Sequence, residues 1–272
     1  MKITNNLSEI LCGNNFQDFA DFKLNHYDNL ELDNDILNKS GIIFCKTDYL
    51  TELFLKIENS DKSYVLITHM SDYPITKQIF INRPKCIKRW FAQNTELIND
   101  IISAIPIGVE NYKGNHKSLF SKPQYLIDYA YKLNNKPKYD DTVYCNWNIG
   151  NNFIERNGVI KKLKCSYVKE QGREWLDYID NMSNFKFIIS PPGNGIDCVR
   201  TWETLYCGGV PIVKKHPIYD SFLNLPIIQV SDYSEVTSEL LSTFDYCKYD
   251  LNLLNMSYWK TLITNSYINI KS

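Results

Sequence analysis

The chain lacks any long apolar run, and it lacks an excess of charge of either sign. None of its apolar stretches approaches the ~20 residues that a membrane-spanning helix requires, and no apolar signal segment follows the first methionine. Its 30 basic and 31 acidic residues create no overall field that would attract nucleic acid or an anionic membrane. We therefore expect a soluble protein without a membrane span or a nucleic-acid partner, in which any recognition of phosphate is local.

The sequence also lacks a Cys-x-x-Cys pair and any cluster of histidine, cysteine and carboxylate residues with the spacing of metal ligands. Its eight cysteines are scattered, and several lie inside apolar stretches, where a reduced thiol packs as a small hydrophobic group. Free thiols of this kind are typical of a reducing compartment. The sequence therefore predicts a cytoplasmic protein without a metal site.

Strand-like and helix-like segments alternate along the chain, which is typical of an α/β fold with parallel sheets. Short apolar runs predict strands over residues 41–45, 64–68, 86–91, 104–108, 142–147, 185–189, 210–213 and 227–230. Apolar residues at helical spacing predict helices over residues 49–57, 94–102, 122–134, 174–182 and 197–206 and a helical C-terminus.

A polar stretch at residues 134–138 interrupts this alternation and is the best candidate for a linker. It predicts two Rossmann-like domains, over residues 1–138 and 139–272. Because ligands of parallel sheets bind at the carboxyl ends of the strands, two such domains facing each other would enclose a ligand in the cleft between them.

The strongest candidate for a ligand site is the loop Ser190-Pro191-Pro192-Gly193-Asn194-Gly195, between the predicted strand 185–189 and the predicted helix 197–206. Its glycines let backbone N–H groups approach a ligand closely. Asp197 can cap the following helix, whose N-terminus attracts an anion. The pattern therefore predicts a diphosphate cradle, with ligand-binding residues Pro192, Gly193, Asn194, Gly195 and Asp197.

Arg200 and Glu203 lie on one face of that helix, because they are three residues apart. A guanidinium binds phosphate through its planar fork, and a carboxylate can accept two hydrogen bonds from a ribose diol. One helix face could thus bind a nucleotide. The alternative is a solvated salt bridge worth less than ~1 kcal/mol, beside a loop that is only a turn. The residues alone leave both interpretations open.

Two common phosphate motifs do not fit this loop. A dinucleotide fingerprint needs a third small residue where Cys198 stands, and an acidic residue about twenty positions later, where the sequence has Lys214-Lys215-His216-Pro217. A P-loop needs a Gly-Lys-Ser/Thr sequence, which does not follow the loop. The site is therefore expected to bind neither NAD nor a nucleotide in the manner of a P-loop.

Residues 185–203, together with Gly208-Gly209-Val210-Pro211-Ile212-Val213, resemble the donor-site signature of exostosin-like glycosyltransferases. Shorter stretches, in the same order along the chain, are similar to compact sugar transferases of large algal viruses and their ribitol-xylosyltransferase relatives. These stretches are residues 69–72, 90–94, 105–108 and 146–148, with Arg156. The resemblance implies that Arg200 and Glu203 face the diphosphate and ribose of the donor, and it adds Asn148 and Arg156 to the donor-binding residues.

Transfer of a sugar with inversion needs a base that removes a proton from the attacking hydroxyl. Residues His69-Met70-Ser71-Asp72 follow a predicted strand of the first domain and would reach the cleft. Asp72 is the first candidate for the base and His69 the second. The alternatives are that Asp72 closes a turn before Pro74 and that His69 is structural. Trp90 could stack on an acceptor sugar or belong to the core.

The resemblance thus implies a GT-B-like fold and an inverting glycosyltransferase that moves a sugar from a UDP-sugar to a hydroxyl of a glycan acceptor, with xylose as one candidate sugar. No Asp-x-Asp motif occurs in the second half, so metal-independent transfer, with no cofactor besides the nucleotide-sugar co-substrate, is expected. If the protein is viral, its compartment would be the host cytoplasm. The alternatives are a noncatalytic nucleotide-sugar or glycan-binding module and a Rossmann-type oxidoreductase.

Overall fold

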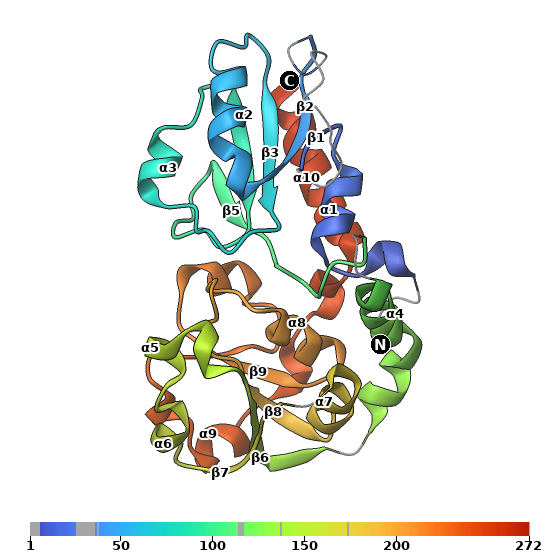
Figure 1. Ribbon diagram of the computed structural model, residues 1–272, viewed down its shortest axis with the longest axis vertical. Helices are drawn as coiled ribbons and strands as arrows, with labels where there is room; N and C mark the ends of the chain where they lie inside the picture. Colours follow the sequence, from blue (N-terminus) through green and yellow to red (C-terminus); the bar gives the residue numbers. More distant parts are fainter. Residues whose placement is uncertain are drawn as a thin grey trace.

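The computed structural model describes residues 6–25, 36, 38–113, 117–136, 138–172 and 174–271. The chain forms two α/β halves, each built on a parallel five-stranded sheet, and Figure 1 shows the first half above the second. Two parallel sheets with helices on their faces confirm the predicted α/β class and are consistent with two Rossmann-like domains.

The first sheet contains β1 (Phe22–Leu24), β2 (Gly41–Lys46), β3 (Tyr64–His69), β4 (Ile87–Ala92) and β5 (Ile102–Ala104), in that spatial order. Its strands are buried on both faces, as expected for a parallel sheet. Alternate side chains therefore enter two cores. One core is shared with α2 (Leu50–Ile57), and the other with α1 (Gly13–Phe19) and α10 (Met256–Lys271). The short α3 (Lys77–Ile81) precedes β4.

The second sheet contains β6 (Tyr139–Asn146), β7 (Ser166–Glu170), β8 (Phe185–Ile189), β9 (Val210–Lys214) and β10 (Ile228–Val230). Their spatial order is β10-β9-β8-β6-β7. After β6 the chain continues to β7 on one side of β6 and then to β8 on the other side. Such a point, where the strand order reverses, opens a crevice beyond the carboxyl ends of the two strands. Here the crevice lies beyond β6 and β8.

Helices cover both faces of the second sheet. One face carries α4 (Lys117–Asn135), α7 (Trp175–Met182) and α8 (Val199–Tyr206). The other carries α6 (Val159–Lys162) and α9 (Ser238–Ser242), while α5 (Phe153–Arg156) follows β6. The loop after β6 and the loop after β8 therefore meet beside the N-terminus of α8.

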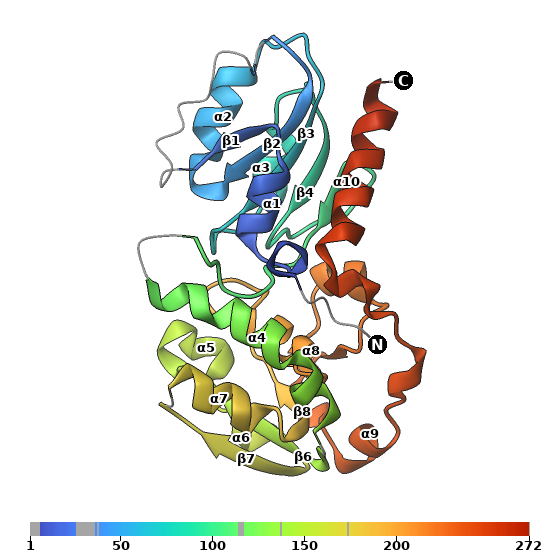
Figure 2. The same ribbon diagram turned by 90° about the vertical axis from the view of Figure 1, so that its right-hand side faces the viewer.

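A continuous apolar core joins the two halves. Trp202 of α8 packs edge-to-face on Phe222, at a centroid separation of 5.2 Å. Phe222 in turn packs edge-to-face on Trp259 of α10, at 6.1 Å. Figure 2 shows α10 running along the first sheet on the side opposite α2. The predicted boundary at residue 138 thus lies between the two sheets, but α10 packs on β3 and β4 of the first half, and α4 packs on α8 of the second.

One predicted helix is wrong, because residues 94–102 form turns that lead into β5. The Oδ1 atom of Asn99 accepts hydrogen bonds from the backbone N–H groups of Ile101 and Ile102, at 2.8 and 3.1 Å. Such side-chain bonds to nearby backbone compete with helical bonds. The strand predicted at 104–108 is correspondingly early, at Ile102–Ala104. The sequence also gave no signal for β1, β7 or α1.

Among the described residues, none of the helices combines the length and the apolar character that crossing a bilayer would need. The seven cysteines whose side chains the structure describes are free thiols, and five of them are buried. Burial raises the pKa of Cys12 and of Cys207 to about 12, so both stay protonated at neutral pH. These thiols pack as apolar groups.

Candidate functional site

A cleft of about 350 Å³ lies at the carboxyl ends of β6 and β8, where the strand order reverses. The first half contributes Asp72, Ile107 and Glu110 to its lining. The second half contributes Asn148, Asn151, Arg156, Trp175, Tyr178, Gly193, Asn194, Gly195, Asp197, Cys198, Val199, Arg200 and Glu203. All predicted site residues except His69 and Pro192 therefore line one cleft between the halves.

Arg156 braces the two loops that form the floor of the cleft. Its side chain is 5 % exposed, and its Nε and Nη1 atoms donate to the carbonyls of Pro192 and Asn148, at 2.8 and 2.7 Å. A Cβ atom on Gly193 would lie 2.8 Å from Nη2 of Arg156, so a glycine is needed there for close approach. Burial, and then the charge of Arg200, lowers the pKa of Arg156. Arg156 holds the loop and adds positive charge beneath it.

Gly195 lets the two halves approach closely. A Cβ atom there would lie 2.5 Å from Nδ2 of Asn94, which belongs to the first half. Oδ1 of Asn94 accepts a hydrogen bond from the backbone N–H of Asp197 at 3.0 Å. Beside them, Nδ2 of Asn194 donates to Oδ2 of Asp72 at 3.2 Å, again across the halves. The predicted phosphate loop is therefore also the seam between the two domains.

Asp197 uses its carboxylate to join the halves. Its Oδ2 atom accepts from the backbone N–H of Ile107 at 2.8 Å, and both oxygens accept from Nε1 of Trp202. Burial raises the pKa of Asp197 to about 7, against the opposing effect of these donors. The predicted helix cap is wrong, because α8 begins at Val199 and its N-cap residue is Cys198, which makes no side-chain cap bond. Asp197 lines the cleft and accepts a hydrogen bond from the backbone N–H of this N-cap residue at 2.9 Å, but it is not the N-cap itself.

Glu203 and Arg200 are not a solvated surface pair. Glu203 is 4 % exposed, and its Oε1 atom accepts from Nε1 of Trp175 at 2.7 Å. Burial raises the pKa of Glu203, while the bond from Trp175 and the charge of Arg200 act in the opposite direction. The Nε atom of Arg200 is buried without a hydrogen-bond partner. Glu203 is therefore fixed at the edge of the cleft by Trp175, while the Nε–H group of Arg200 is left without an acceptor.

Tyr178 is a site residue that sequence reasoning missed. It follows Trp175 by one helical turn on α7, and its hydroxyl is buried without a hydrogen-bond partner. Burial raises the pKa of this phenol well above its ordinary value, so it stays protonated and can donate. The i,i+3 spacing of Trp175 and Tyr178 was visible in the sequence, but only the packing of α7 beside α8 brings them to Arg200.

A second cavity of about 390 Å³ continues the cleft past Arg200. It shares Asn148, Trp175, Tyr178 and Arg200 with the cleft. Its other lining residues are Asn146, Trp147, Gln171 and Gly172. The combined space therefore has one polar chamber beside the glycine loop and one chamber with aromatic rings and amides. Six buried side-chain atoms lack a partner among the described residues, and two of them, Nε of Arg200 and the hydroxyl of Tyr178, belong to residues that line both chambers.

His69 and Trp90 both belong to the interior. Nε2 of His69 bonds the carbonyl of Pro106 at 3.0 Å, while its Nδ1 accepts from the backbone N–H of Met70 at 2.7 Å. Burial lowers the pKa of His69 to about 4, and its ring stacks on Phe16. Both nitrogens are thus used, which favours the structural alternative for His69. Trp90 is fully buried and donates to Oγ1 of Thr68, so it cannot stack on a ligand.

The first half offers two carboxylates to the cleft. Asp72 is exposed and follows β3, as the sequence predicted. Glu110, which the sequence analysis missed, follows β5 and forms a 2.8 Å ion pair with Lys122 of α4. The ammonium of Lys122 also lies 5.6 Å from the ring centre of Trp175. Because Glu110 already has a cationic partner, Asp72 is the freer of the two carboxylates.

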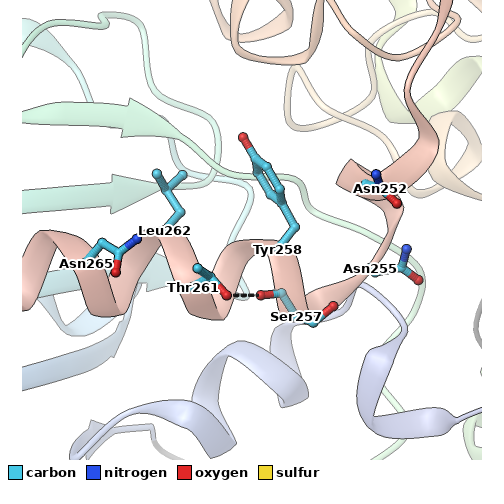
Figure 3. Close-up of a pocket in the computed structure, with 7 residues that line it drawn as sticks. All are labelled: Asn252, Asn255, Ser257, Tyr258, Thr261, Leu262 and Asn265. Carbon is cyan, nitrogen blue, oxygen red and sulfur yellow. Dashed lines mark hydrogen bonds between the residues drawn. The ribbon is translucent and has the colours of Figure 1, made fainter.

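Another cavity, of about 480 Å³, lies elsewhere, along α10. Figure 3 shows Tyr258 and Leu262 on one side of this helix, with Ser257 and Thr261 nearby. Asn252, Asn255 and Asn265 complete a lining that contains no charged group. It offers no cationic side chain to a phosphate, whereas the cleft between the halves contains Arg156 and Arg200 and is therefore the better candidate site.

No protein-family model matches the chain, and no curated protein matches it either. In the part of the chain that the structure describes, no group of three or more histidine, cysteine or carboxylate side chains could hold a metal ion. The functional assignment therefore depends on the geometry of the cleft and on the resemblance of its motif.

Proposed function

We propose that the protein is an inverting glycosyltransferase with a GT-B-like arrangement, which transfers a sugar from a UDP-sugar to a hydroxyl of a glycan acceptor. Its cleft lies between the carboxyl ends of two parallel sheets, which is where ligands of such sheets bind. The second half would hold the donor, and the first half would supply the catalytic base. The exostosin-like motif at residues 185–203 supports the same assignment.

The observation that carries the proposal is the pair of buried donors without partners, Nε of Arg200 and the hydroxyl of Tyr178. Leaving a buried polar group unsatisfied costs about 1 to 3 kcal/mol, so proteins rarely keep two of them in one place. A ligand with phosphate and ribose oxygens would satisfy both. Binding of such a ligand would remove the free-energy cost of the two unsatisfied donors, which is a reason for the site to retain them.

The two chambers divide the donor into its chemical parts. The diphosphate would lie beside the glycine loop, near the N-terminus of α8 and the guanidinium of Arg200. The ribose would lie at Glu203, whose Oε1 atom is oriented by Trp175. The nucleobase would occupy the second chamber, where rings and side-chain amides can stack on it and bind its edge.

Asp72 is the proposed base, because His69 has no free ring nitrogen. In the reaction, the acceptor oxygen forms a bond to the anomeric carbon while the bond from that carbon to the diphosphate oxygen breaks. The proton of the acceptor hydroxyl passes to the carboxylate of Asp72, and the electron pair of the broken bond leaves with the diphosphate. Arg200 stabilises the charge that develops there.

The proposal is tested with a panel of nucleotide sugars, read by thermal shift and by nucleotide release. We expect one UDP-sugar to stabilise the wild type and to lose this effect in Arg200→Ala and Glu203→Ala. The matched controls are Arg89→Ala, in the first sheet away from the cleft, and Glu239→Ala, on α9. The identity of the sugar, including xylose, is read from the same panel.

The outcomes separate the candidate functions. Binding of NAD, or of no nucleotide sugar at all, would contradict the proposal. Binding of a UDP-sugar without turnover on any acceptor, unchanged in Asp72→Asn, would instead favour a noncatalytic binding module. Turnover that is lost in Asp72→Asn while donor affinity is kept would support Asp72 as the base.

A further inference from the structure

Large aromatic side chains are exposed at few places on this molecule. Among the described residues, three have more than 60 % of their surface exposed: Tyr73 at 64 %, Tyr139 at 63 % and Phe153 at 63 %. Tyr139 is the first residue of β6, at the amino-terminal end of the strand, whereas the cleft lies beyond its carboxyl end. Tyr73 and Phe153 instead follow the carboxyl ends of β3 and β6; they lie one and two residues beyond Asp72 and Asn151, which line the cleft.

A short path of contacts connects the two exposed rings. Tyr73 is the neighbour of Asp72, whose carboxylate accepts a hydrogen bond from Asn194 at 3.2 Å. Gly193, the neighbour of Asn194, accepts through its carbonyl from Nδ2 of Asn152 at 2.9 Å. Phe153 is the next residue after Asn152. The two rings therefore come from different halves, and each directly follows a residue that hydrogen-bonds to Gly193 or Asn194 of the loop.

Keeping these rings in water is unfavourable, and the nearby Ile154, 89 % exposed, adds to the apolar surface. One face of a sugar ring presents C–H groups that pack on an aromatic ring, while its hydroxyls remain free for polar partners such as Asp72 and Asn194. Trp90, which the sequence made a candidate for this contact, is buried. Tyr73 directly follows Asp72, so an acceptor that packs on its ring would lie near that carboxylate.

We propose that Tyr73 and Phe153 form the acceptor subsite, each ring packing on a sugar of the glycan that delivers its hydroxyl to Asp72. This inference rests on the proposed transferase function and extends it to the chemistry of acceptor recognition. The acceptor is accordingly a saccharide with at least one exposed apolar ring face. A small alcohol or water would gain nothing from the rings and would be a poor acceptor.

The test uses the full chain and a printed array of neutral oligosaccharides in the presence of UDP, followed by kinetics with the glycan that binds best. We expect Tyr73→Ala and Phe153→Ala to reduce array binding and to raise the KM for that glycan roughly two- to tenfold each, the size of one aromatic contact. Tyr73→Phe and Phe153→Tyr keep the rings and should behave like the wild type.

The control Tyr139→Ala removes an equally exposed ring from the amino-terminal end of β6 and should leave array binding unchanged. UDP affinity should also be unchanged in all variants, because none of the substituted residues is among those that line the donor cleft. If the wild type binds UDP but no glycan, or if the alanine variants bind glycans as the wild type does, the inference is overturned and the proposed function survives. If the wild type does not bind UDP, the proposed function itself fails. A self-association that is lost in Tyr73→Ala would assign the rings to a subunit contact and overturn the inference.

Discussion

Replacing Tyr178 by phenylalanine should make the ligand-free protein more stable and the donor site weaker. The hydroxyl of Tyr178 is buried without a partner, so its removal relieves a desolvation cost of about 1 kcal/mol or more. The ring is unchanged and keeps its tilted contact with Tyr144, at a centroid separation of 6.4 Å. If the hydroxyl donates to the nucleotide, the same change should weaken UDP binding about tenfold, which corresponds to ~1.4 kcal/mol.

The matched control is Tyr206→Phe on α8. The hydroxyl of Tyr206 is also buried, but it accepts from the backbone N–H of Leu11 at 2.8 Å and donates to the carbonyl of Leu254 at 2.7 Å. Its removal leaves both of these groups unpaired, which should cost about 2 kcal/mol. UDP affinity should not change, because Tyr206 does not line the cleft.

Urea unfolding gives the stability of each variant, and calorimetric titration with UDP gives its affinity. Because one apolar core joins the two halves, we expect a single unfolding transition. A loss of stability in Tyr178→Phe comparable to that in Tyr206→Phe would mean that the hydroxyl of Tyr178 has a partner after all. A gain in stability with unchanged UDP affinity would mean that the hydroxyl does not face the nucleotide.

Three further changes test other parts of the site. Gly195→Ala should lower the free energy of unfolding by about 2 kcal/mol, because its Cβ atom would lie 2.5 Å from Nδ2 of Asn94. Gly150→Ala, whose Cβ atom would lie 3.2 Å from the nearest atom, is the control and should cost less. The midpoints of urea unfolding compare the two variants. Because burial lowers the pKa of His69 from 6.5 to about 4, its contribution to stability is complete above pH 6.5 and falls with pH through 4. Between pH 7 and pH 5, the free energy of unfolding of the wild type should fall by about 2 kcal/mol more than that of His69→Gln. Equal falls in the two proteins would contradict the lowered pKa of His69. Asp72→Asn should reduce kcat at least a hundredfold with little change in UDP affinity, measured by nucleotide release and titration.

The sequence predicted most of the sheet strands because the signals that define them are local. The apolar runs at 64–68 and 185–189 correspond to β3 and β8, and the loop after β8 could be read from its glycines. The failed helix at 94–102 had a local cause as well, but the turn made by Asn99 became visible only in the structure. A periodicity pattern registers only the spacing of apolar residues, whereas the side chain of Asn99 stabilises a turn in this segment.

The site was harder to predict, because its parts take their roles from residues far away in the chain. Gly195 is required by the approach of Asn94, which belongs to the other half. His69 stood at a strand end, as a base would, but Phe16 of the unpredicted α1 covers it. Tyr178 became a candidate only when its hydroxyl was found without a partner. None of these relations has a signature at fixed sequence spacing.

The return of α10 to the first sheet has a consequence for how the protein is made. One face of β3 and β4 is covered in part by α10, whose buried residues Met256, Trp259 and Ile263 are synthesised long after those strands. The second sheet has all its strands by Val230 and can form first on the ribosome. The half that is translated first therefore completes its core only after the final helix has emerged, and we expect it to expose part of an apolar face until then.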